Sequence, residues 1–339
     1  MIAVYVSNAE SGDISVLHLD TASGALIPIQ LVPVGGKVMP LALSPDTRHL
    51  YAARRSDPLE VLSFAIDAAS GELAPVGSAP LPHSMAFIAT DPLGRFLFSA
   101  SYGGDQIAVS AIDANGVVQA AQQVLPTGRH AHAIQADPSG RFVFATSLGG
   151  GVVMQYLYDA VTGQLKANTP PLLSPHEAAS PRHFVFGRDA RCMYLLNELD
   201  AIIDVLAFDD QAGTLLPVQK INSLPSGFKG EAWASDLHMT PDGQFLYSSE
   251  RRSNTLAAFR IDPSSGQLNL IAHTPTEMQP RGFNITPGGQ FLIAAGELSH
   301  QVSVYRIDTQ NGILAPVSSC AVGQGPNWIE SIVLAQTET

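Results

Sequence analysis

Short stretches in which apolar and polar residues alternate recur along the whole chain. Clear examples are I-S-V-L-H-L-D at 14–20, I-A-V-S-A-I-D at 107–113, I-D-V-L-A-F-D at 203–209 and V-S-V-Y-R-I-D at 302–308. A period of two places alternate side chains on opposite faces of a β-strand, so each stretch predicts a half-buried strand. Each stretch also ends in Asp, a residue that favours the start of a turn. The pattern therefore predicts an all-β protein built from short strands.

Two turn motifs punctuate these strands at nearly constant spacing. A small polar residue followed by glycine recurs at Gly24, Gly71, Gly116, Gly163, Gly213, Gly266 and Gly312, with steps of 47, 45, 47, 50, 53 and 46 residues. A turn related to P-D-G-R, followed by an apolar strand, begins at residues 44, 91, 137, 187, 240 and 286. A repeat of this length with four short strands per unit is typical of a β-propeller.

The two motifs differ in number, because the glycine turn occurs seven times and the proline-type turn six times. The difference is explained if the two chain ends share one blade, with residues 2–32 supplying three strands and residues 327–334 the innermost one. Such closure leaves no open edge in the ring. We therefore predict a single seven-bladed β-propeller domain over residues 1–339, with four antiparallel strands per blade and the last blade closed by both ends.

Composition and charge narrow the possible partners and compartment. The chain is 45% hydrophobic and 14% charged, which allows a large core, and its net charge of −12 argues against binding to nucleic acid or to an anionic membrane. Only two cysteines occur, Cys192 and Cys320, so a disulfide framework is not expected. No stretch approaches the roughly 20 apolar residues of a membrane span, and the N-terminus does not have the pattern of a signal peptide. These features predict a cytoplasmic protein.

The two faces of the expected ring differ in sequence. The repeated turns share one face and carry Arg48, Arg95, Arg141 and Arg191, which recur with the repeat and are interpreted as structural. The opposite face collects the starts of the innermost strands, which vary from blade to blade and converge on the ring axis. Charged groups at such positions are costly unless they are paired or bind a ligand. The residues expected to surround one shallow funnel there are His132, Arg182, His183, Trp233, Asp236, Arg281 and Trp328.

Four of the residues on this face are candidates for chemistry. Arg182 and Arg281 each follow a proline, and their guanidinium groups suit a carboxylate or phosphate. His132 and Glu198 are the candidate proton-transfer groups. A purely structural role, in which each arginine pairs with Glu198, Glu250 or Asp236, stays open. The candidate substrate-binding residues are His183, Asn197, Trp233, Asp236, Arg251, His300 and Trp328.

Several well-known motifs are missing, which restricts the chemistry. The chain has no G-x-S-x-G, H-E-x-x-H or C-x-x-C, and no G-x-G-x-x-G follows a strand. The H-x-H at 130–132 leaves open a metal site with Asn197, Glu198 and Asp200, although we expect neither a metal nor another cofactor. The W-D dipeptide of protein-binding propellers is also missing.

Several longer motifs carry a resemblance to a known family. They are P-R-H-F-V-F at 181–186, N-E-L at 197–199, D-L-H-M-T-P-D-G at 236–243, P-T-E-M-Q-P-R-G-F-N-I at 275–285, A-A-G-E-L-S-H at 294–300 and A-V-G-Q-G-P-N-W at 321–328. With these motifs the whole chain resembles the bacterial 6-phosphogluconolactonases of the seven-bladed lactonase propeller family. The resemblance implies that His132, Arg182, Glu198 and Arg281 lie in the active site.

The resemblance also implies a reaction, the hydrolysis of 6-phospho-D-glucono-1,5-lactone in the pentose phosphate pathway. His132 or Glu198 would act as general base, without a cofactor, and the partner would be a small anionic sugar lactone. Hydrolysis of another sugar lactone, a muconate-type lactonizing cycloisomerisation and a non-catalytic docking propeller remain as alternatives. The chain is expected to be a monomer or a weak homodimer.

Overall fold

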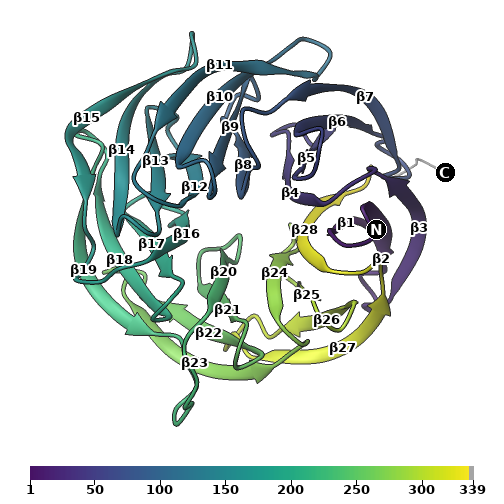
Figure 1. The fold of residues 1–339 in the computed structure, drawn as a ribbon. Helices are drawn as coiled ribbons and strands as arrows, with labels where there is room; N and C mark the ends of the chain where they lie inside the picture. The colour runs from purple at the N-terminus through teal and green to yellow at the C-terminus, as the bar shows by residue number, and fades with distance from the viewer. Residues whose placement is uncertain (336–339) are drawn as a thin grey trace.

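The computed structural model describes residues 1–335 and shows seven four-stranded antiparallel sheets arranged as blades in a ring (Figure 1). The predicted seven-bladed all-β fold is confirmed. The end of the predicted domain, at residue 339, lies outside the described residues. Among residues 1–335 no helix is long and apolar enough to cross a membrane.

The four strands of each blade follow one another from the axis outward. The innermost strands are β4 (Val38–Leu43), β8 (Phe87–Thr90), β12 (Ala131–Ala136), β16 (Pro181–Phe186), β20 (Ala234–Met239), β24 (Pro280–Ile285) and β28 (Pro326–Val333). The second strands are β1 (Ile2–Asn8), β5 (His49–Arg54), β9 (Phe96–Ser101), β13 (Phe142–Ser147), β17 (Cys192–Asn197), β21 (Phe245–Glu250) and β25 (Phe291–Gly296).

The two outer layers complete the blades. The third strands are β2 (Asp13–Leu19), β6 (Glu60–Ile66), β10 (Gln106–Ile112), β14 (Val152–Asp159), β18 (Ile202–Asp209), β22 (Thr255–Ile261) and β26 (Gln301–Ile307). The outermost strands are β3 (Leu26–Pro33), β7 (Leu73–Pro80), β11 (Val118–Pro126), β15 (Gln164–Leu173), β19 (Thr214–Asn222), β23 (Leu268–Pro275) and β27 (Leu314–Ala321).

The ring closes through a blade made by both ends of the chain, as predicted. Strand β28 pairs antiparallel with β1, with Ile332 opposite Ala3 and Glu330 opposite Tyr5, so the sheet order is β28-β1-β2-β3. The first and last parts of the chain are thus joined by a ladder of backbone hydrogen bonds, and this ladder closes the ring.

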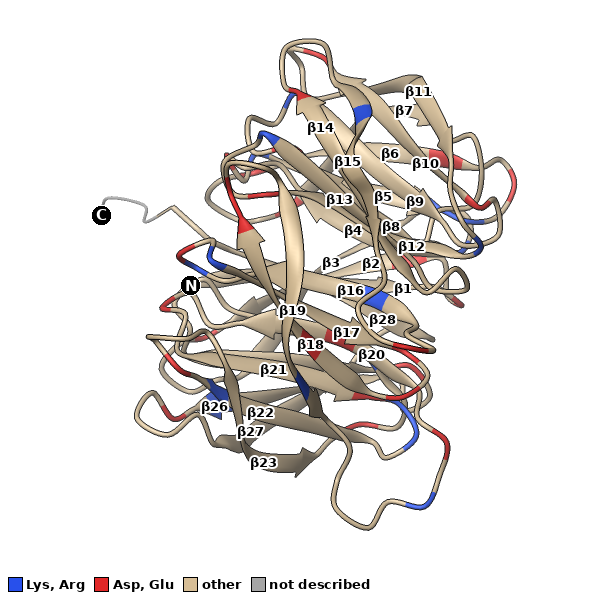
Figure 2. Cartoon of the chain, turned by 90° about the vertical axis from the view of Figure 1, so that its left-hand side faces the viewer, with Lys and Arg blue, Asp and Glu red and all other residues tan. Residues whose placement is uncertain are grey.

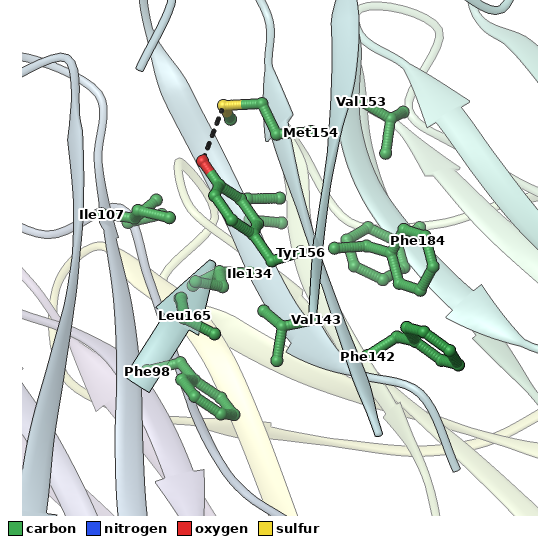
Figure 3. Close-up of a cluster of buried hydrophobic side chains, with 14 of the residues drawn as sticks. Phe98, Ile107, Ile134, Phe142, Val143, Val153, Met154, Tyr156, Leu165 and Phe184 are labelled. Carbon is green, nitrogen blue, oxygen red and sulfur yellow. Dashed lines mark hydrogen bonds between the residues drawn. The ribbon is translucent and has the colours of Figure 1, made fainter. Parts of the chain in front are cut away.

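The core lies between neighbouring blades and is built from the alternating apolar positions. Its largest cluster includes Phe98, Ile134, Phe142 and Phe184, which come from three successive blades (Figure 3). Tyr156 in the same cluster donates a hydrogen bond from its hydroxyl to the Met154 sulfur at 3.6 Å. Figure 2 shows that Lys, Arg, Asp and Glu lie mainly at strand ends and in loops, so charge is concentrated at the two faces of the ring.

The repeated glycine turns hold adjacent blades together. Gly71 has a φ of 72°, and its carbonyl accepts a hydrogen bond from Tyr5 of the preceding blade at 2.9 Å. A Cβ added at Gly71 would meet the Ala3 Cβ at 2.5 Å. The same bond joins Tyr194 to Gly266 and Tyr247 to Gly312. The left-handed conformation and the close approach both require glycine here, so this motif belongs to the scaffold.

Three of the four arginines in the other repeated turn are structural as well. Arg95, Arg141 and Arg191 each donate hydrogen bonds to backbone carbonyls in the outer turn of the next blade, at Ala160, at Asp210 and at Pro263 respectively. This confirms that they serve the scaffold, and it leaves the opposite face for function.

Candidate active site at the mouth of the central channel

Two register positions in each blade converge at the axis on the face opposite the repeated turns. The first residue of an innermost strand pairs with the last residue of the second strand, as in Pro181 with Asn197 and Ala131 with Ser147. The second residue of the innermost strand lies at the mouth in six blades, where it is Met39, His132, Arg182, Ser235, Arg281 or Asn327. The residue that directly follows the second strand also lies at the mouth, and in the seven blades it is Ala9, Arg55, Tyr102, Leu148, Glu198, Arg251 or Glu297. Together these residues form the mouth of the channel.

A buried charged cluster lies at the centre of the mouth. Arg182 donates from Nε to Glu198 Oε2 at 2.7 Å, and Arg251 Nη2 lies 3.0 Å from the same oxygen. Trp233 donates from Nε1 to Glu198 Oε1 at 3.3 Å, and the Arg251 guanidinium lies 3.9 Å from the centre of a Trp233 ring. Arg182 and Arg251 also donate to the carbonyls of Ser235 and Ala234. One carboxylate is therefore shared by two guanidinium groups.

The balance of charge in this cluster is positive. Burial alone would raise the pKa of the Glu198 carboxyl, but Arg182 and Arg251 outweigh burial and hold that pKa below its usual value. Burial and the charge of Arg182 lower the pKa of Arg251 to about 9, so Arg251 stays protonated near neutral pH. A guanidinium group such as that of Arg182 is not deprotonated in proteins. Two cations and one anion give this buried site a net positive charge. Such a charge, shielded from water, favours an anionic ligand or a developing oxyanion.

His132 lies beside this cluster with a neutral ring. It is 5% exposed, and burial, reinforced by the positive charge of Arg182, lowers the pKa of its imidazole well below 6.5. Its Nδ1 is buried and has no hydrogen-bond partner in the described part of the chain, residues 1–335. The ring of Tyr102 stands edge-on to it at 6.0 Å and stacks on His130 at 4.1 Å. A neutral imidazole at pH 7 can accept a proton, whereas the Glu198 carboxylate is already held by cations. The geometry therefore favours His132 over Glu198 as general base.

Arg281 lies in a cavity of about 280 Å³ beside the cluster, together with an arginine that the sequence analysis did not select. This second arginine, Arg55, donates from Nε to the Ser84 hydroxyl at 3.0 Å, and no ion pair to it is present in residues 1–335. Burial and the charge of Arg281 lower the pKa of Arg55 to about 10. Arg281 keeps one acidic contact, Nη1 to Glu297 Oε1 at 3.3 Å. Two guanidinium groups in one cavity repel each other, and a bound anion would relieve that repulsion.

Three of the predicted substrate-binding residues lie one level deeper in the channel. His183 and Trp328 share a register position and pack against Phe87, at 5.1 and 5.5 Å between ring centres. Asp236 accepts a hydrogen bond from His183 at 2.8 Å. Below them a second cavity of about 320 Å³ is lined by Gln135, His238 and Glu330 among others. The rings of Phe87, His183 and Trp328 thus lie between the arginine-rich mouth and this second cavity, whose lining contains no arginine or lysine.

Two predicted site residues do not join this group. Asn197 is fully buried and donates to the Ile202 carbonyl and to Asp204, while its oxygen accepts from the Ser180 backbone, so it holds the loop that carries Glu198. His300 is exposed and accepts a hydrogen bond from the Gly325 backbone at the rim.

The open possibility of a metal site finds no support in the geometry. Within residues 1–335 no three His, Cys, Asp or Glu side chains are gathered as metal ligands would be. Asp200 pairs with His176 at 2.9 Å, and Glu198 is held by arginines.

A comparison with protein families shows to which family the chain belongs. Residues 1–331 match the family model described as "Lactonase, 7-bladed beta-propeller". The chain belongs to this lactonase family. Relatives in the family include the 6-phosphogluconolactonases of Pectobacterium atrosepticum, 42% identical over 331 residues and 98% of each chain, and of Yersinia pestis, 40% identical over 96% of this chain and 97% of the relative.

Solved structures agree with this lactonase family. A periplasmic gluconolactonase of Pseudomonas aeruginosa superposes with a TM-score of 0.91 and 27% identity, covering 99% of this chain and 100% of that one. A protein of Bacteroides fragilis described as a putative 6-phosphogluconolactonase has a TM-score of 0.90 at 22% identity, over 98% of both chains, and shows the shared fold alone.

Sequence reasoning missed several residues of this lactonase-family mouth, chiefly Arg55 and Tyr102. The preceding residue, Arg54, pairs with Glu60 at 2.7 Å and is structural. Aligning the blades on the last residue of each second strand would have found both, because Arg55 and Tyr102 occupy the same position as Glu198 and Arg251.

Proposed function

We propose that this protein hydrolyses 6-phospho-D-glucono-1,5-lactone to 6-phosphogluconate, the lactonase step of the pentose phosphate pathway. The observation that carries the substrate choice is the cavity shared by Arg55 and Arg281, which lies next to the buried Arg182–Glu198–Arg251 cluster. The cavity suits a phosphate, and the cluster suits the lactone carbonyl. The names of the relatives support the same reaction.

The chemistry needs a base, an oxyanion site and an anchor for the phosphate. Water attacks the lactone carbonyl while His132 accepts its proton, a contribution of about 10²–10⁴-fold for a well-placed base. The negative charge that develops on the carbonyl oxygen is stabilised by the positive cluster around Arg182 and Arg251. One such donor is worth about 10²–10³-fold. Arg55 and Arg281 hold the phosphate, which fixes the ring in the mouth. Every group in this account comes from the chain itself.

The test is the rate of lactone hydrolysis by the pure protein above the spontaneous background, with and without a chelator. Hydrolysis of the phosphorylated lactone at a kcat/KM at least tenfold higher than that of unphosphorylated gluconolactone supports the proposal. Equal rates on both lactones would leave a gluconolactonase, and turnover of a muconate alone would point to the cycloisomerase chemistry. Loss of activity with the chelator would contradict the metal-free mechanism.

The compartment and the oligomeric state belong to the same proposal. Cys192 and Cys320 are both free thiols and lie in different blades, which suits a reducing compartment and supports a cytoplasmic location. The periplasmic relative makes cell fractionation the necessary check. A monomer or weak homodimer is expected, and light scattering during size-exclusion chromatography measures it.

A further inference from the structure

A carboxylate beneath the mouth fixes the protonation of a buried histidine. Asp236 on β20 lies with Oδ1 2.8 Å from His183 Nδ1 and with Oδ2 3.2 Å from His238 Nε2. His183 and Asp236 are 3% and 6% exposed. Burial raises the pKa of the Asp236 carboxyl, but the two histidines overcome that effect and hold the pKa below its usual value. An ionised Asp236 can only accept, so His183 carries its proton on Nδ1 and leaves a lone pair on Nε2.

The free nitrogen of His183 lies on the side of the ring away from Asp236. The two nitrogens of an imidazole point in nearly opposite directions, and with Nδ1 engaged, Nε2 is directed away from β20. The His183 ring also packs against the His132 ring, with 5.0 Å between ring centres and 62° between planes. His183 Nε2 and His132 Nδ1 are both buried, and neither has a hydrogen-bond partner among residues 1–335. Each orphaned nitrogen is costly to bury unless it interacts, and the neighbouring ring offers the complementary group.

We propose that Asp236, His183 and His132 form a relay in which each residue fixes the tautomer of the next. Asp236 holds the proton of His183 on Nδ1. His183 Nε2 then accepts from His132 Nδ1–H, directly after a small ring movement or through one water. This leaves the lone pair of His132 on Nε2, which is then free to accept a proton from the attacking water. His132 is the catalytic residue, and His183 and Asp236 are positioning residues. This inference rests on the proposed lactone hydrolysis for its chemical consequence.

The steps of the reaction balance without any co-reactant. The water oxygen bonds to the lactone carbonyl carbon, and one water proton moves to His132 Nε2. The bond between that carbon and the ring oxygen then breaks, and His132 returns the proton to the ring oxygen, which becomes the sugar hydroxyl. The new carboxylic acid loses its remaining proton to solvent. During the interval, His183 and the Asp236 charge stabilise the imidazolium of His132, as a buried carboxylate does in other hydrolases.

The groups around the relay keep His132 and His183 neutral, so what the relay sets is the position of the proton on each ring and not its charge. His132 faces Arg182 of β16, Arg281 of β24 and Arg251 after β21, and burial with these charges keeps it neutral. Burial and the Arg182 charge lower the pKa of His183 to about 4. The other groups near Asp236 are His238 on the same strand, whose pKa is raised by Asp236 against the effect of burial, and Glu330 on β28.

The decisive measurement is ¹⁵N NMR of the imidazole nitrogens in histidine-labelled protein, assigned with His132→Gln and His183→Gln. Both histidines are expected as the Nδ1–H tautomer at pH 7. Asp236→Asn keeps the shape but can donate to His183, and it is expected to switch both rings toward Nε2–H. In parallel, kcat should fall by about 10²–10⁴-fold with KM changed less than about threefold.

Glu330→Gln is the matched control, because it removes a half-buried carboxylate near Asp236 whose hydrogen bond is with Trp328 and not with a residue of the relay. It is expected to leave both tautomers and kcat unchanged. An Nε2–H tautomer of His132 in the unmodified protein, or no change of tautomer in Asp236→Asn, overturns the relay even if hydrolysis is found. Correct tautomers without hydrolysis reject the proposed function instead. If Asp236→Asn does not fold, the tautomer of His132 in His183→Gln decides, since loss of Nδ1–H is expected there.

Discussion

Arg182 donates from Nε to Oε2 of Glu198 at 2.7 Å, and the register of the innermost and second strands places the two residues side by side. Both side chains are buried, and Arg251 shares the same carboxylate oxygen. A buried carboxylate between two guanidinium groups is more important for holding the cations in place than for accepting a proton. The first prediction tests this distinction.

Glu198→Gln is expected to destabilise the protein by about 3–5 kcal/mol, because it leaves two buried cations without their counterion. Urea denaturation followed by fluorescence measures the change. Glu231→Gln is the control, since Glu231 is exposed and lies 3.8 Å from Arg252, and its loss should cost less than about 0.5 kcal/mol. A stable Glu198→Gln variant whose kcat alone is lost would instead make Glu198 the base.

Arg55→Ala and Arg281→Ala should each raise KM for the phosphorylated lactone by about 10–100-fold, the worth of one charge-assisted contact of about 1.5–3 kcal/mol. The KM for unphosphorylated gluconolactone should change little, because only the phosphate occupies their cavity. Steady-state kinetics on both substrates separates the effects. Arg188→Ala removes the same charge from the exposed opposite face and should change neither KM; equal losses on both substrates would contradict the phosphate site.

The pH profile should report the low pKa of His132. Because burial and Arg182 lower that pKa well below 6.5, the base is already free at pH 6.5, and kcat/KM should be flat between pH 6.5 and 8. Activity should fall only on further acidification, as His132 takes up a proton. The profile is measured after subtracting spontaneous hydrolysis at each pH. An acid limb centred near 6.5 would mean that His132 is not the base, or that it is solvated.

Glu330→Gln should stabilise the protein at alkaline pH. Burial raises the pKa of the Glu330 carboxyl from 4.5 to about 7. Because the folded pKa is raised, this carboxyl favours the folded state fully below pH 4.5, and that contribution is lost as pH rises through 7. The unmodified protein should therefore lose on the order of 2–3 kcal/mol between pH 4.5 and 8 that the variant does not lose. Urea titrations at the two pH values measure it, and parallel losses in both proteins would contradict the raised pKa of Glu330.

The sequence by itself determined the ring. Alternation with a period of two defined the strands, and the glycine turns set the repeat, because a left-handed residue and the contact of Gly71 with Ala3 admit only glycine. The shared blade of β28 and β1 also followed from counting turns. The contrast between the two faces correctly located Arg182, Glu198, Trp233 and Arg251 in one mouth.

Only the tertiary structure decided which side chains meet across blades. Arg54 and Arg55 are adjacent and chemically alike, yet one pairs with Glu60 and the other lines the cavity of Arg281. Likewise, nothing local shows that Asp236 reaches His183, 53 residues away. Strand patterns depend on neighbouring residues in the chain, whereas these contacts join residues that come from different strands and blades. The blades are brought together only when the ring is closed, so the chemistry of the mouth appears only in the complete fold.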